Sequence, residues 1–263
     1  MSQTHDPAQP IPAPFALDAS AWPLRIYTLG RFSIVKDGQP VHWSGKGQKR
    51  PLDLLKALIS CGAREVSQEK LAEMLWPEAE GDAAKASLKA TLHRLRGVVG
   101  HEAIAVAAGR VTLDAQRCWV DVWALERRLT QLLDTQLPAI AAGEEQQLLA
   151  LYHGPFLHDT DSPFAIGPRE RLRSKFLRAM EHVGQGLCAV QACEAALLCY
   201  QKGLEVDPLA ERFYRGLMEC YECLQRHAEG LEVYQHCRQT LGRELGVAPS
   251  AAIEVLAKAL RKQ

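Results

Sequence analysis

Residues 66–99, VSQEKLAEMLWPEAEGDAAKASLKATLHRLRGVV, have the pattern of two amphipathic helices, expected at 67–75 and 82–99. Ser67 is a suitable cap for the first, and Trp76-Pro77 ends it because proline restricts the residue before it. At about 100° per residue, the second helix carries an apolar stripe of Ala84, Leu88, Leu92, Leu95 and Val99. A basic stripe runs beside it, made of Lys85, Lys89, His93 and Arg96. A helix that buries one stripe and exposes the other fits the major groove of DNA.

Short strands are expected on both sides of these helices. Residues 24–43, LRIYTLGRFSIVKDGQPVHW, are rich in β-branched and aromatic residues, and Asp37-Gly38 favours a two-residue hairpin turn. Residues 48–60 have the period of another helix, and 103–115 favour a second hairpin around Ala108-Gly109. The predicted order is therefore hairpin, three helices and hairpin.

Charge is unevenly divided, although 31 Lys and Arg balance 31 Asp and Glu over the 263 residues. Residues 24–118 carry 15 Lys and Arg against 10 Asp and Glu, a net charge of +5, whereas 119–263 carry −3 and 1–23 carry −2. Further cations surround the basic stripe, namely Lys46, Lys49 and Arg50 near the first helix and Arg110 in the second hairpin. Arg94 lies away from both stripes, toward solvent or a flanking phosphate. Cations on separate elements fit phosphate anchoring.

From residue 119 onward the pattern is helical, with helices expected at 121–135 and 144–152, a loop at 153–168 and long helices from Arg169. A 34-residue repeat matches small and aromatic residues, in the pairs Ala196/Gly230, Tyr200/Tyr234 and Gly203/Cys237. This period is typical of tetratricopeptide repeats, whose paired helices cross at small residues. Because two repeats seldom bury a full core, helices at 169–178 and 250–261 are expected to cap the stack.

Composition excludes several classes of protein. With 47% hydrophobic and 24% charged residues, the chain has enough apolar side chain for a globular core. It has neither an apolar run of membrane-spanning length nor a secretory signal, so we expect a cytoplasmic protein with reduced cysteines. Residues 1–23 hold five prolines and no Lys or Arg, which favours a flexible leader.

No motif for catalysis, a cofactor or a metal stands out. Gly45-Lys46-Gly47 lacks the spacing of a phosphate-binding loop, and we expect a protein that is not an enzyme and needs no cofactor. Cys220-x-x-Cys223 with His227, and His236-Cys237 after them, resemble a zinc-ligand set. In a helical repeat they would share one face, where cysteine serves as a small hydrophobe. We therefore expect no metal site, and a redox role for Cys188, Cys193 or Cys199 has no better support.

Three segments together resemble a known DNA-binding fold. They are RIYTLGRFSIVKDG (25–38), KGQKRPLDLLKALI (46–59) and VSQEKLAEMLWPEAEGDAAKASLKATLHRLRGVVG (66–100). These segments are similar to the winged helix-turn-helix of the OmpR/PhoB type, in the version found in the SARP family of bacterial regulators. Residues 152–180 and 207–250 resemble the bacterial transcriptional activator domain (BTAD) that follows it. The most specific parts are EMLWP (73–77), LHRLR (92–96) and ELGVAPS (244–250).

The resemblance implies a mainly α protein with a small β part. It places a winged helix-turn-helix DNA-binding domain at 24–118 and an all-α, tetratricopeptide-like BTAD domain at 119–263. It implies a transcriptional activator whose 82–99 helix enters the major groove. By position, Lys85, Ser87, Lys89 and His93 face DNA. Lys49 and Arg50 match the basic entry to the first helix, and Arg110 lies in the wing. The implied partners are double-stranded promoter DNA, RNA polymerase or another regulatory protein, and a second copy of the chain on DNA.

Two other functions remain open on the sequence. Ala86 and Ala90 are short where relatives often carry longer polar groups, and the wing lacks an aromatic residue after its glycine. A protein-interaction adaptor whose winged helix no longer binds DNA is therefore one alternative. A repeat domain that senses a ligand and controls DNA binding is the other.

Overall fold

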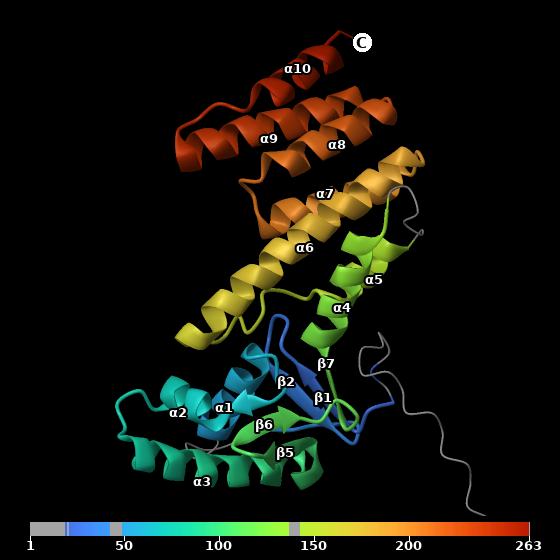
Figure 1. Cartoon of the computed structure of the whole chain (residues 1–263). Coiled ribbons are helices and arrows are strands. Elements are labelled where there is room, and N and C mark those ends of the chain that lie inside the picture. Colours follow the sequence, from blue (N-terminus) through green and yellow to red (C-terminus); the bar gives the residue numbers. More distant parts are fainter. Residues whose placement is uncertain (1–18, 20, 43–48, 137–142, 263) are drawn as a thin grey trace, which may run out of the picture. The chain divides into compact units, whose positions relative to one another are not determined.

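The computed structural model describes residue 19 and residues 21–42, 49–136 and 143–262 (Figure 1). The chain divides into two compact units, one containing residues up to Leu125 together with Leu151–Arg169, the other Glu126–Ala150 together with the residues from Glu170 onward. The leader predicted at 1–23 falls largely outside the described residues. Its end differs from the prediction, since Trp22 is 4% exposed and its large apolar side chain is more stable in the core than in water.

A four-stranded sheet forms one part of the first unit. It contains β1 (Leu24–Tyr27), β2 (Ser33–Lys36), β3 (Gln39–Pro40) and β7 (Cys118–Val120), in the order β3-β2-β1-β7. The predicted turn is confirmed, because Asp37 and Gly38 both have positive φ, at 49° and 79°, between the antiparallel strands β2 and β3. The parallel pairing of β7 with β1 was not predicted.

Three helices and a smaller sheet form the other part of the first unit (Figure 1). The helices are α1 (Lys49–Ser60), α2 (Gln68–Leu75) and α3 (Gly81–Val99), within a residue or two of the predicted bounds. The sheet has the order β4-β6-β5, from Val66–Ser67, Arg110–Leu113 and Ile104–Ala107. The turn between β5 and β6 is the wing tip, where Ala108 and Gly109 have φ of 48° and 72°, as predicted for a tight hairpin.

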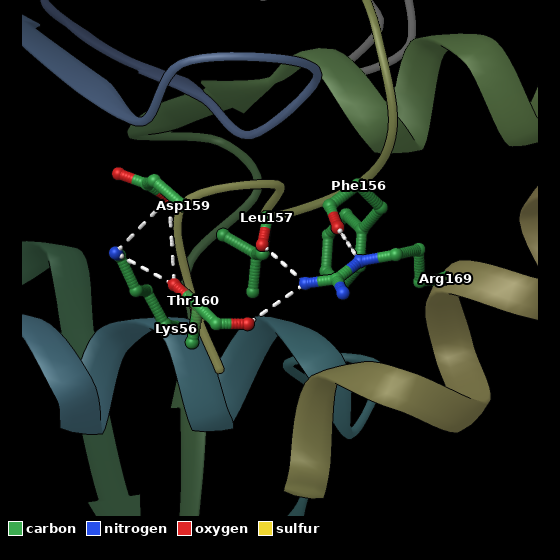
Figure 2. Close-up of polar contacts among 6 residues, drawn as sticks. All are labelled: Lys56, Phe156, Leu157, Asp159, Thr160 and Arg169. Carbon is green, nitrogen blue, oxygen red and sulfur yellow. Dashed lines mark hydrogen bonds and ion pairs between the residues drawn. The ribbon is translucent and has the colours of Figure 1, made fainter. Parts of the chain in front are cut away.

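The loop between α5 (Glu144–Leu151) and α6 (Pro163–Ala189) also belongs to the first unit. Its backbone bonds to the residues after β1, with Leu157 N donating to Thr28 O at 2.7 Å and Gly30 N donating to Pro155 O at 3.0 Å. Figure 2 shows how side chains hold this loop. The Arg169 guanidinium donates to three loop carbonyls, and Lys56 of α1 donates to Thr160 Oγ1 at 2.8 Å. The loop is thus fixed at its two ends.

The remaining helices are α4 (Asp121–Asp134), α5 (Glu144–Leu151), α6 (Pro163–Ala189), α7 (Cys193–Val206), α8 (Glu211–Cys223), α9 (His227–Leu245) and α10 (Ala251–Leu260). The expected loop at 153–168 is too long, because α6 begins at Pro163 and contains Pro168. Pro163 is tolerated as the first helical residue, where its missing N–H has no partner to lose. Pro168 lies in the second turn and removes one backbone hydrogen bond of the helix. Within the described part of the chain, no helix combines the length and apolarity needed to cross a membrane.

The 34-residue repeat is confirmed in the backbone. Gln191 after α6 and Gln225 after α8 lie 34 positions apart, and both adopt left-handed φ, at 61° and 58°. In each turn the next residue donates to a carbonyl five positions earlier, Ala192 to Leu187 at 2.9 Å and Arg226 to Tyr221 at 2.8 Å. This is the same helix-ending motif used twice. The predicted cap at 250–261 is α10, which buries Ile253, Ala257 and Leu260 against the second repeat.

Two glycines test this repeat packing. A Cβ on Gly203 would lie 2.4 Å from the Phe213 ring, whereas a Cβ on Gly242 meets nothing within 4 Å. We expect Gly203→Ala to lower the free energy of unfolding by about 1–3 kcal/mol through overpacking. Gly242→Ala should instead raise it by about 0.5–1 kcal/mol, since alanine favours the helix. Urea unfolding of both variants measures these changes. Equal changes in the free energy of unfolding would contradict close packing of Gly203 against Phe213.

Candidate nucleic-acid interface

Helix α3 presents the two predicted stripes on different sides. Its apolar stripe is buried, at 0–6% exposure, and consists of Ala84, Leu88, Leu92, Leu95 and Val99. Lys85, Lys89 and His93 are exposed, and Ser87 is half-buried. The apolar periodicity fixes the rotation of α3 on α1 and α2, and this rotation exposes the basic side chains.

Two grooves meet at Lys85. One, of about 310 Å³, is lined by the start of α2, Lys85 and the wing tip with Arg110. The other, of about 560 Å³, runs along α3 past Lys89 and His93 to Val106 of β5. The exposed cations of α3 and the wing therefore border one continuous concave surface, which we call the α3–wing surface. A cationic concavity beside a helix has the shape and charge to receive a duplex.

Arg96 and Arg50 are held by bonds inside the protein. The half-buried Arg96 guanidinium donates to Ile104 O from two nitrogens, at 3.2 and 2.9 Å, and so ties α3 to the wing strand. Arg50 donates to Leu75 O at 3.2 Å and lies 5.8 Å from the centre of the Trp76 ring. Both keep positive charge near the surface, but their geometry is fixed by the fold.

The other predicted cations have more varied settings. Arg110 donates to Glu65 O at 3.0 Å yet remains exposed in the wing. Lys49 is exposed at the first residue of α1, and Lys46 lies outside the described residues. Arg94 is exposed on α3 and borders neither groove, which agrees with its predicted place away from both stripes.

Charge around the start of α1 affects a neighbouring carboxyl. Burial raises the pKa of Asp53, and the cations Lys49, Arg50 and Lys56 oppose this shift. Burial is the larger of these influences, so the three cations only partly offset its effect on the carboxyl.

Gln68 was not predicted as a site residue. It is the first residue of α2, lines both grooves, and its backbone N–H donates to Gly109 O of the wing tip at 2.9 Å. An amide side chain at this place offers both a donor and an acceptor to a base edge. The cap at Ser67 was the available signal, because it places the half-buried Gln68 at the start of α2.

Comparisons with known proteins give one consistent result. A family model described as bacterial transcriptional activator domain matches residues 120–261. Regulatory protein AfsR of Streptomyces griseus is 29% identical over 243 residues, which cover 89% of this chain and 24% of AfsR. Transcriptional regulatory protein EmbR of Mycobacterium tuberculosis is 23% identical over 256 residues, which cover 89% of this chain and 62% of EmbR.

A solved structure confirms the fold class. The structure of Mycobacterium tuberculosis EmbR in complex with a low affinity phosphopeptide matches with a TM-score of 0.66 at 23% identity. The match covers 92% of this chain and 65% of that one. The described residues thus have the predicted mainly α fold with a small β part. This chain spans about a quarter of AfsR and less than two thirds of EmbR.

Proposed function

We propose that this chain, which belongs to the bacterial transcriptional activator domain family, is a transcriptional activator that binds promoter DNA through its α3–wing surface. Lys85 carries the proposal, since this residue of α3 borders both grooves and shares one of them with the start of α2 and the wing tip. An exposed cation at that meeting point can reach the backbone or a base edge of a duplex whose major groove receives α3. Regulators named AfsR and EmbR are among its relatives.

The proposed contacts divide into two kinds. Lys85, Ser87, Lys89 and His93 would read base edges from α3, together with Gln68 from α2. Phosphate contacts are assigned to the exposed cations Lys49, Arg50, Arg94 and Arg110, and to Lys46, which lies outside the described residues. Arg96 keeps α3 and the wing in a fixed relation through its bonds to Ile104 O. Its contribution to DNA binding is therefore mainly one of positioning.

The domain assignment belongs to the same proposal. Residues 24–118 would hold DNA, and 119–263 would contact RNA polymerase or another regulatory protein, with two copies of the chain on one promoter. Helical repeats stack into extended surfaces that suit protein partners. The protein would act in the cytoplasm, where bacterial promoters lie, without enzymatic chemistry.

A mobility-shift assay with genomic fragments tests the proposal. The full chain, at moderate salt, should retain a small set of duplex fragments in preference to bulk DNA, because base contacts add specificity to phosphate binding. Retention of no DNA would favour an interaction adaptor instead. Equal retention of all fragments would contradict base reading by α3 while leaving phosphate binding in place.

A further inference from the structure

Four cysteines gather in the second unit where α6 ends, α7 begins and α8 ends. The Sγ atoms of Cys188, Cys193 and Cys220 all lie within 4.8 Å of one another, and those of Cys188 and Cys220 are 3.3 Å apart. Cys223 lies one turn after Cys220 on α8, next to the three thiols that are all within 4.8 Å of one another. These residues form the four-cysteine cluster, and its thiols are reduced.

We propose that the four-cysteine cluster binds one zinc ion, with Cys188, Cys193 and Cys220 as three assembled thiolate ligands and the exposed Cys223 turning in as the fourth. A tetrahedral zinc with bonds of about 2.3 Å to sulfur places its ligand atoms roughly 3.8 Å apart. Among Cys188, Cys193 and Cys220, the Cys188–Cys220 separation of 3.3 Å and the upper limit of 4.8 Å bracket this value. Cys188-x₄-Cys193 and Cys220-x₂-Cys223 also have the spacings by which paired cysteines bind zinc. The proposal is independent of DNA binding.

Repeat packing does not account for these cysteines. The positions 34 residues away are occupied by Glu222, His227, Gly186 and Ala189, so no equivalent position carries a thiol. The helix-ending turns at Gln191 and Gln225 bring the two pairs together instead. The sequence predicted only a packing role for Cys220 and Cys223. Their neighbours Cys188 and Cys193 are about 30 residues earlier in the sequence, so the four cysteines do not form one recognisable motif.

The burial of the cluster fits a site that a cation can enter. Cys193 and Cys220 are buried, whereas Cys188 is half-buried and Cys223 is exposed. The outer thiols can meet a hydrated cation first, and the inner thiols then replace its remaining water. Zinc is the probe of choice because thiolate ligands favour a soft or borderline cation over magnesium or calcium.

Metal content and cobalt substitution test the site. The full chain, purified with a reducing agent and without chelator, should contain close to one zinc per chain by mass spectrometry of the elements. After zinc removal, added Co²⁺ should give thiolate-to-cobalt charge-transfer bands and the visible bands of tetrahedral cobalt, and Zn²⁺ should remove both. Zinc should also raise the melting temperature of the metal-free protein, because it binds only the folded chain tightly.

Single substitutions separate metal binding from packing. Cys223→Ser changes an exposed side chain and should weaken zinc affinity by about a hundred-fold or more, because one of four ligands is lost. Cys220→Ala should do the same. Cys237→Ala is the matched control, since Cys237 is equally buried on the adjacent α9, and it should keep wild-type cobalt bands.

Three results would overturn the proposal. The first is reduced protein that holds almost no zinc and gives no cobalt bands. The second is a chain isolated metal-free with a disulfide within the cluster, seen as a loss of two hydrogens in mass. The third is Cys223→Ser protein with cobalt bands as strong as those of Cys237→Ala.

Discussion

The Lys85→Ala/Lys89→Ala double variant is expected to bind promoter DNA about a hundred-fold more weakly than the wild type. Both side chains are exposed on α3 and border the grooves of the α3–wing surface. Each lost hydrogen bond from a charged donor removes about 1.5 kcal/mol, and two of them correspond to roughly two factors of ten in affinity. Fluorescence anisotropy with a retained genomic duplex measures this loss.

Arg94→Ala is the control, because it removes a cation from the same helix at a position that borders neither groove. Its affinity should fall by less than about ten-fold, as for one peripheral phosphate contact. All three substitutions change exposed residues and should leave the melting temperature unchanged. A double variant that binds as tightly as wild type, or no more weakly than Arg94→Ala, would show that α3 does not enter the groove through this stripe.

Asp121→Ala is expected to lower the free energy of unfolding by about 3–5 kcal/mol, the range for breaking a buried, hydrogen-bonded charge. Asp121 is 2% exposed and accepts bonds from Thr28 N and Oγ1, Leu29 N and Val122 N, at 2.6–2.9 Å. Burial raises the pKa of this carboxyl, and its hydrogen bonds oppose the shift. The alanine variant leaves three backbone donors without this partner.

Asp121→Asn separates the effect of lost hydrogen bonds from the effect of lost side-chain volume, because asparagine is nearly the same size as aspartate. Both carboxylate oxygens face donors, so an amide nitrogen in either place would oppose an N–H group, and at least half of the loss should remain. Asp114→Ala removes one accepted bond, from Gln116 N, and should lower stability by only about 1 kcal/mol. Equal unfolding curves for the Asp114 and Asp121 variants would contradict the role given to Asp121.

Much of the first unit was predictable because its signals are local. The apolar stripe of α3, the cap at Ser67 and the turns at Asp37-Gly38 and Ala108-Gly109 each involve neighbours within a few positions. The 34-residue repeat was equally visible, since the same contacts recur at a fixed spacing. These features determine which side of α3 is buried and hence which cations are exposed.

The missed features depend on contacts between distant residues. Thr28 and Asp121 lie 93 positions apart, and nothing in either neighbourhood indicates that β7 joins β1 or that the loop before α6 returns to Thr28. The hydrogen bonds of Arg96 were also not predictable. Helical geometry places Arg96 in the basic stripe, but its acceptor, Ile104 O, belongs to the wing strand β5. The four-cysteine cluster is a further case, assembled from three helices.

The salt dependence of wild-type binding to a retained duplex tests the central claim most directly. If exposed cations of α3, the wing and α1 neutralise about four phosphates, the logarithm of the affinity should fall with the logarithm of salt concentration at a slope of roughly −4. A titration of the full chain by anisotropy gives this slope. Absence of binding even at low salt, or an affinity that does not change with salt, would contradict a DNA-binding surface built on Lys85.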